Sequence, residues 1–141
     1  KGIEFGADYG INYRTQNLAE EVLKVTDGKG VDVVAENIGD PDLFPSALES
    51  LARFGRMVTA GAHGGGKVML DISRLYIRRI QIIGTPGCDF SDIEWSMDAA
   101  KDGTIRPPII DRIMPLSEAE AAHRLIEARE LVGKILLDPS A

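Results

Sequence analysis

Short runs of apolar, largely β-branched residues alternate in this chain with stretches whose apolar residues recur at helical spacing. Three such runs lie at residues 31–37, 56–60 and 80–84, and a glycine follows or ends each of them. Runs this apolar predict strands of a parallel sheet that helices cover on both faces. Glycine at the carboxyl end of such a strand lets a ligand approach the backbone, and ligands bind at that edge in open α/β sheets. The pattern therefore predicts part of a nucleotide-binding α/β fold.

Three segments with apolar residues at helical spacing are interspersed with these strands. Asn17 and Glu20 resemble a capping box at the start of the first helix, and residues 27–30 end it. The second helix has apolar residues at i, i+3, i+4, i+7 and i+8, which predicts an amphipathic helix. These residues are Phe44, Ala47, Leu48, Leu51 and Ala52. Gly55 suits the position just after its end, and a short third helix is expected over residues 72–78.

The order of the predicted elements is that of a parallel sheet through the first part of the chain. A short strand over residues 8–14 comes first, and helices then separate the apolar strands. The pattern changes near residues 85–87. We therefore expect a partial dinucleotide-binding domain over residues 1–88 and a separate segment over residues 89–141.

The second segment is predicted to contain two helices and a strand. Capping boxes predict that its helices begin near Ser91 and Ser117. Trp95 and Met97 are expected on the buried side of the first of them. A short strand over residues 134–137 is expected to end the segment.

Composition narrows the class of partner. The formal net charge of −6 at pH 7 argues against nucleic acid, because phosphate binding depends on clustered lysine and arginine. The one dense basic spot, Arg74, Arg78 and Arg79, suits a solvated helix face or the edge of an interface. Apolar residues make up 44% of the chain and charged residues 27%, which is ordinary for a globular protein. No run approaches the roughly 20 apolar residues of a membrane span.

Cysteine and histidine usage limits the disulfide and metal chemistry of this segment. The single cysteine, Cys88, excludes an internal disulfide and a cysteine-rich zinc site, and it fits a reducing cytoplasm. Neither His63 nor His123 has a cysteine or glutamate partner at ligand spacing, so no metal site is expected here. No Gly-x-Gly-x-x-Gly occurs, and the sequence starts at Lys1 as if cut from something longer.

Five segments, taken in order, resemble the medium-chain dehydrogenase/reductase family, which includes zinc-type alcohol dehydrogenases and zinc-free quinone oxidoreductases. They are GADYGINYR, GVDVVAENIG, ALESLARFGRMVTAG, IIGTPG and AAHRLIEARELVGKILLDP. The resemblance covers nearly the whole chain and implies an α/β fold: part of a doubly wound, Rossmann-type parallel sheet with C-terminal helices. It also implies that the zinc ligands, the substrate pocket and the first βαβ unit, with its phosphate-binding turn, precede this segment. Residues 89–141 would pack on that catalytic domain.

The sheet order of the family, 3-2-1-4-5-6, implies a difficulty for this segment by itself. In that order, strands 1 and 2 lie between the strand at Ile11 and the strand at Val31. Without them, the strand at Ile11 has no neighbours and the strand at Val31 is an unpaired apolar edge. Bare edges pair with other chains. We therefore expect this segment to self-associate, to re-pair its strands, or to remain attached to the rest of a longer protein.

The resemblance also implies a set of cofactor-binding residues, most of them at strand ends. They are Tyr13, Arg14, Asn37, Ile38, Gly39, Gly61, Ala62, Gly84, Thr85 and Lys134. In members that use NADPH, a tyrosine matching Tyr13 lies by the 2′-phosphate, and Arg14 could pair with that dianion. This favours NADP over NAD, although Tyr13 also suits ordinary packing at a strand end. Glu36 is on the wrong strand to bind the ribose, so we predict a structural role for it.

The predicted function is that of the cofactor-binding part of an oxidoreductase. The whole enzyme would transfer a hydride between NAD or NADP and an alcohol, carbonyl or quinone, with or without zinc. No catalytic residue is expected in this segment, which alone should be inactive. The strand at residues 80–84 commonly pairs with its two-fold mate in this family, so a homo-oligomer is expected. The alternative is a non-catalytic α/β interaction module that dimerises through exposed sheet edges.

Overall fold

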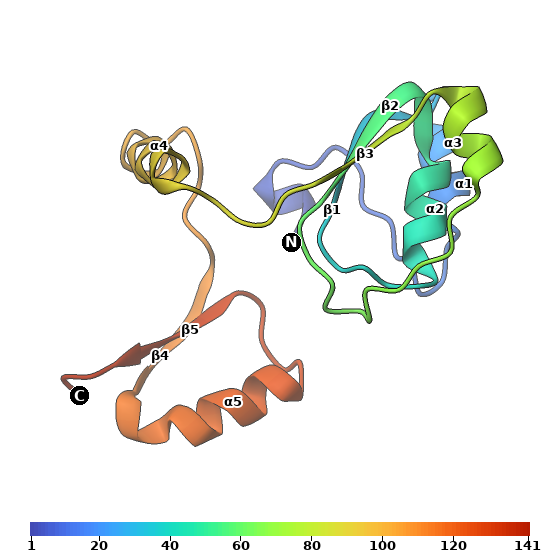
Figure 1. Cartoon of the computed structure of the whole chain (residues 1–141). Helices are drawn as coiled ribbons and strands as arrows, with labels where there is room; N and C mark the ends of the chain where they lie inside the picture. Colours follow the sequence, from blue (N-terminus) through green and yellow to red (C-terminus); the bar gives the residue numbers. More distant parts are fainter. The chain divides into compact units, whose positions relative to one another are not determined.

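The computed structural model describes all 141 residues as two compact units, Lys1–Gly87 and Cys88–Ala141. The first unit holds a three-stranded sheet with three α-helices, and the second holds a two-stranded sheet with two α-helices (Figure 1). Every strand pair is parallel. The predicted α/β class is therefore confirmed.

The first unit alternates helices and strands. Its elements are η1 (Ile3–Phe5), α1 (Leu18–Val25), β1 (Val31–Glu36), α2 (Leu43–Glu49), β2 (Leu51–Thr59), α3 (Ile72–Arg78) and β3 (Gln81–Gly84). The strands lie in the order β1-β2-β3, which agrees with the sheet order that the family resemblance implies, and β1 is an edge strand. Figure 1 shows α1, α2 and α3 on one side of this sheet.

The core of the first unit lies between α2 and the sheet. Phe44 and Leu48 of α2 pack with Leu51 and Met57 of β2 and with Ile80, which precedes β3. Leu51 and Met57 are fully buried. Burying side chains of this size stabilises a fold by about 1.5–3 kcal/mol each, so this cluster holds the sheet and its helices together.

The opposite face of the sheet has no helix of this unit on it. Ala35, Val58 and Ile83 are paired in register across β1, β2 and β3, and the exposed fraction of Ile83 is 43%. Val33 is also 51% exposed. The prediction that the strands are buried on both faces is thus wrong for this chain by itself, because α1–α3 cover one face only.

Residues 8–14, predicted as a strand, do not form one: residues 9–12 are irregular, and a turn begins at residue 13. Asn12 collects local hydrogen bonds: its carbonyl accepts from the Thr15 and Gln16 amides, and its side chain accepts from the Arg14 amide. A strand is stable only when a neighbour pairs with it, and no strand in this chain pairs here. The local bonds of Asn12 therefore decide the conformation.

The boundary between α2 and β2 also differs from the prediction. The helix ends at Glu49, and Leu51 and Ala52, predicted as helical, belong to β2. The Ser50 hydroxyl donates to the Ala47 carbonyl, and the Ser50 carbonyl accepts from the Val31 amide. The apolar spacing continues beyond the helix because the first residues of β2 are buried as well.

The second unit contains a short βαβ arrangement. Its elements are α4 (Phe90–Lys101), β4 (Ile110–Pro115), η2 (Leu116–Glu118), α5 (Ala119–Glu127) and β5 (Lys134–Asp138). Strands β4 and β5 pair in parallel. Its buried hydrophobic residues are Ala99 and Ala122. No helix in the chain has the length and apolar character needed to cross a membrane.

In the second unit one strand was missed and three sequence predictions fail. Strand β4 was not predicted. The cap of α4 is Asp89, which forms a capping box with Asp92, rather than Ser91. Ser117 caps no α-helix, since it lies within η2. Trp95 and Met97, expected to be buried, are 65% and 57% exposed, because α4 buries Ala99 instead.

Candidate functional site

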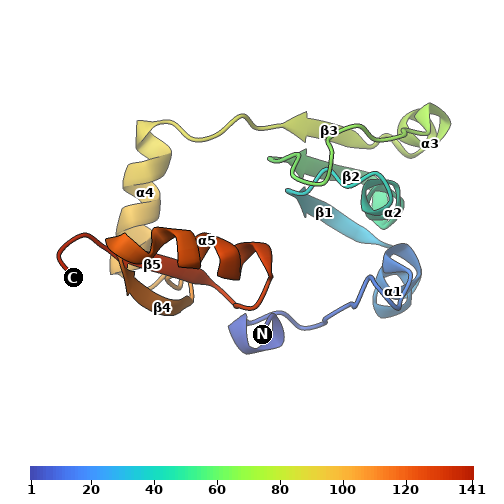
Figure 2. The same ribbon diagram turned by 90° about the horizontal axis from the view of Figure 1, so that it is seen from below.

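The three strands of the first unit end in register. Glu36 pairs with Thr59, and Thr59 pairs with Gly84. Figure 2 shows the three arrowheads of β1, β2 and β3 pointing in the same direction. The chain therefore leaves all three strands at one edge of the sheet, which is the edge where open α/β sheets bind ligands.

The loops after β1 and β2 are joined by backbone hydrogen bonds. The Ala60 amide donates to the Glu36 carbonyl at 2.9 Å, and the Gly64 amide donates to the Ile38 carbonyl at 2.6 Å. The Gly66 amide donates to the Gly39 carbonyl at 3.0 Å. Two groups of predicted cofactor-binding residues, 37–39 and 61–62, thus lie next to each other.

Glycine is required where these two loops touch. A Cβ atom at Gly61 would overlap the Asn37 carbonyl oxygen. A Cβ atom at Gly39, whose φ is +63°, would lie 3.0 Å from the Ala62 Cα atom. By contrast, no atom lies within 4 Å of the Cβ position of Gly84. The loops after β1 and β2 are therefore tightly packed, while the backbone at the end of β3 is open to approach.

Glu36 fastens the turn after β1 to the end of β2. One carboxylate oxygen accepts hydrogen bonds from the Ile38 amide at 2.7 Å and the Gly39 amide at 2.6 Å. The other accepts from the Thr59 hydroxyl at 2.9 Å. Burial alone would raise the pKa of Glu36, but the bonds from Gly39, Ile38 and Thr59 together hold that pKa below its ordinary value. The carboxylate therefore has a structural role at the site, as predicted from the position of Glu36 in the chain.

The third strand joins the same edge through one further backbone bond. The Thr85 amide donates to the Thr59 carbonyl at 3.0 Å. Gly84 and Thr85 thus lie at the same carboxyl edge of the sheet as residues 37–39 and 61–62. His63, in the loop after β2, is exposed.

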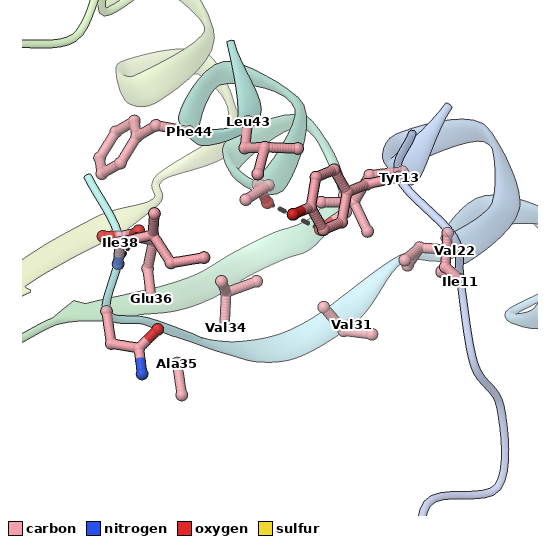
Figure 3. A pocket seen from close by; sticks show the side chains of 14 residues that line it. Ile11, Tyr13, Val22, Val31, Val34, Ala35, Glu36, Ile38, Leu43 and Phe44 are labelled. Carbon is pink, nitrogen blue, oxygen red and sulfur yellow. Dashed lines mark hydrogen bonds between the residues drawn. The ribbon is translucent and has the colours of Figure 1, made fainter. Parts of the chain in front are cut away.

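An apolar cavity of about 320 Å³ lies beside β1. Figure 3 shows Val31 and Val34 projecting from β1 into it, with Leu43 and Tyr13 around them. Its lining residues are Ile11, Tyr13, Leu18, Val22, Val31, Val34, Ala35, Glu36, Asn37, Ile38, Leu43, Phe44, Ala47 and Ser50. Tyr13, Asn37 and Ile38 therefore line the same cavity.

Two of the predicted residues are not grouped with the others. Arg14 is exposed and lies in the turn after residue 13. Lys134 is exposed as well, and it begins β5 in the second unit. For both, a role in cofactor binding stays a prediction.

The side chain of Asp40 is a functional part of the site that the sequence analysis did not single out. One carboxylate oxygen of Asp40 accepts from the Asp42 and Leu43 amides, both at 2.9 Å. This side chain fixes the start of α2 behind the loop after β1. An aspartate whose side chain can accept from amides two and three residues further on, just before a helix, is the sequence signal that could have shown this role.

The side chains of this chain do not form a zinc site. No three His, Cys, Asp or Glu side chains are grouped so that they could hold a metal ion. The residues of this chain therefore do not fit a zinc ion.

Comparison with known proteins matches this chain to one family of dehydrogenases. A family model described as zinc-binding dehydrogenase matches residues 5–137. The chain is 33% identical over 148 residues to a 2-haloacrylate reductase from a Burkholderia species. It is 30% identical over 138 residues to an NAD-dependent alcohol dehydrogenase from Sulfolobus acidocaldarius. These matches cover 98% and 97% of this chain, but 44% and 40% of the two relatives.

A solved structure gives the same picture of the fold. The crystal structure of a 2-haloacrylate reductase matches with a TM-score of 0.81 and 33% sequence identity. The match covers 99% of this chain and 46% of that one. The fold is therefore of the Rossmann type, and the chain spans less than half the length of the proteins it matches.

Proposed function

The chain belongs to the zinc-binding dehydrogenase family, and we propose that it is the cofactor-binding part of an oxidoreductase. The whole enzyme would transfer a hydride between a nicotinamide cofactor and an alcohol, carbonyl or quinone. The observation that supports this most strongly is the common edge at which β1, β2 and β3 end. The names of the relatives, a reductase and an NAD-dependent dehydrogenase, agree with it.

Backbone groups of this chain would orient the cofactor, which itself supplies the hydride chemistry when bound. Residues 37–39 would pass under the adenosine ribose, with their turn held by Glu36. Residues 61–62 would lie beside the nicotinamide, and Gly84 and Thr85 would hold its carboxamide. The openness at Gly84 supports this, since a ligand can reach that backbone without meeting a side chain.

The choice between NAD and NADP rests on Tyr13 and Arg14, and we propose NADP. Tyr13 lines the cavity that Asn37 and Ile38 also line, and Arg14 is exposed next to it in the chain. A guanidinium there would pair with the 2′-phosphate, which NAD lacks. Lys134 would contact a cofactor phosphate in the assembled enzyme.

The remaining parts of the enzyme would come from outside these 141 residues. The cavity lies between Ile11 and Val31, where the family order places two further strands. Those strands would fill it and would carry the phosphate-binding turn. The second unit would pack on the catalytic domain, and the enzyme would be a cytoplasmic homo-oligomer. Zinc, if the enzyme uses it, would be held outside this chain.

Titration calorimetry with NADPH, NADP and NAD tests the proposal. It should be run on this chain and on the full-length protein side by side, together with a turnover assay on an alcohol substrate. We expect the full-length protein to bind NADPH more tightly than NAD, and this chain alone to show no useful turnover. Robust turnover by the chain alone would contradict the assignment of chemistry to the missing part. Equal affinity for NADPH and NAD would contradict the role of Arg14.

The second candidate is an interaction module that holds no nucleotide. The unpaired edge of β1 and the exposed Val33 and Ile83 favour it, because such surfaces pair with other chains. The same calorimetry separates the two candidates. If neither form of the protein binds any of the three nucleotides, the interaction module is the better description.

A further inference from the structure

An exposed cluster of two arginines and a phenylalanine lies at the opposite end of the sheet from the candidate site. Val31 pairs with Leu51 while Val33 pairs with Arg56, so two steps along β1 correspond to five along β2. Residues 52–55, which lie opposite the single residue 32, form a bulge in β2 and include Arg53 and Phe54. Arg79, just before β3, reaches the same place. We call Arg53, Phe54 and Arg79 the Arg–Phe–Arg cluster.

Both guanidinium groups of this cluster lie on one aromatic ring. The Arg53 Cζ atom is 5.2 Å from the centroid of the Phe54 ring, and the Arg79 Cζ atom is 5.5 Å from it. The Phe54 side chain is nevertheless 58% exposed. A guanidinium stacked on a ring keeps the N–H groups of its edge free to bind an oxyanion.

Neither arginine has an acidic partner. Arg74, one helical turn before the cluster, pairs with Glu49 and Asp71, whereas no carboxylate lies within 4 Å of Arg53 or Arg79. Two like charges on one ring repel each other, and no anion of this chain offsets that repulsion. The cluster therefore lacks a counter-charge that a partner could supply.

The backbone holds these side chains in conformations that L-residues rarely adopt. The φ angles of Phe54 and Arg79 are +66° and +54°. Arg78 holds the two segments together, because its guanidinium donates to the Glu49 and Leu51 carbonyls. The backbone therefore places the two segments that carry the cluster next to each other before any partner binds, which lowers the cost of ordering them on binding.

We propose that the Arg–Phe–Arg cluster is a docking surface for an acidic segment of another protein, one that presents carboxylates beside an apolar side chain. The guanidinium edges match carboxylates, and the exposed ring needs an apolar neighbour, which inorganic phosphate does not offer. Nucleic-acid binding depends on more clustered cations than the two arginines of this cluster supply. A short acidic peptide meets both requirements.

Fluorescence anisotropy with a labelled peptide, Asp-Glu-Leu-Asp-Glu-Phe, tests this proposal at low salt. The comparison peptide has the acids replaced by Asn and Gln. We expect binding of the acidic peptide only, and about tenfold weaker binding by the double variant Arg53→Gln/Arg79→Gln, as the loss of charge-assisted hydrogen bonds predicts. Phe54→Asn, which suits the positive φ, should keep the fold and weaken binding as well.

Arg129→Gln is the matched control. Arg129 is exposed, has a φ of +55° and makes no ion pair, but it lies in the second unit. This variant should bind the acidic peptide as the unchanged chain does. Equal binding of both peptides, unchanged binding by the double variant, or tighter binding of an oligothymidylate than of the acidic peptide would each overturn the proposal.

Discussion

The most informative single residue of the candidate site is Glu36, because its carboxylate joins two strand ends. Its pKa lies below the ordinary value in the folded chain. Its stabilising contribution is therefore fully present above the unfolded glutamate pKa, about 4.3, and is lost as the pH falls through the folded value. Glu36→Gln should remove this part of the pH dependence. At pH 7, Glu36→Ala should cost about 1 kcal/mol, since the group is partly solvated.

Urea unfolding at a series of pH values between 7 and the acid limit measures this effect. Glu127→Gln is a suitable control, because Glu127 is an exposed glutamate of α5 whose side chain makes no hydrogen bond. A Glu36→Gln variant with the same pH profile as the unchanged chain would show that the carboxylate does not hold the turn. The sequence indicated a structural role for Glu36, but not its bond to Thr59, because that bond depends on the register of β1 against β2.

Two glycines of the site have opposite surroundings and should respond differently to the same substitution. Gly61→Ala places a methyl group against the Asn37 carbonyl, so we expect a loss of about 1–3 kcal/mol in the free energy of unfolding. Gly84→Ala places it in open space and should change stability by less than about 0.5 kcal/mol. Thermal unfolding of both variants measures the difference. Equal losses would mean that the two loops are not packed as described.

At the scale of elements, apolar runs were predicted well and boundaries less well. Helix α3 has the bounds that the sequence predicted, 72–78. Strand β4 was missed because Asp111 and Arg112 interrupt its apolar pattern, and its only partner, β5, lies about twenty residues further on. The sequence placed residues 37–39 and 61–62 at strand ends, and the parallel pairing of β1 and β2 brings them into contact. The irregular conformation of residues 8–14 could not be predicted from local sequence, because it depends on the lack of a neighbouring strand.

The uncovered face of the three-stranded sheet predicts association of this chain. Ile83 and Val33 are exposed there, and exposed apolar surface of this kind binds other molecules. Ile83→Lys should therefore reduce self-association and the binding of the dye ANS. Sedimentation velocity and dye fluorescence measure the two effects. Met69→Lys, which changes an 82% exposed residue outside the sheet, is the control. An equal effect of both substitutions would argue against the sheet face as the contact.

At the scale of the whole molecule, the two units differ in the size of their cores. The first buries Phe44, Leu48, Leu51, Met57 and Ile80, whereas the second buries only the alanines Ala99 and Ala122 among its hydrophobic residues. Methyl groups remove far less apolar surface from water than these larger side chains do. The second unit should therefore be much the less stable of the two.

Amide hydrogen exchange of the isolated chain tests this difference directly. We expect amides of β2 and α2 to exchange slowly, and amides of α4 and α5 to exchange near the rate of unfolded peptides, because little buried surface opposes their opening. In the full-length protein the same helices should become protected, since Trp95 and Met97 would then be covered by the catalytic domain. Strong protection of α4 in the chain by itself would contradict the inference that the small core leaves the second unit unstable. Weak protection in the full-length protein would contradict the proposal that the second unit packs on that domain.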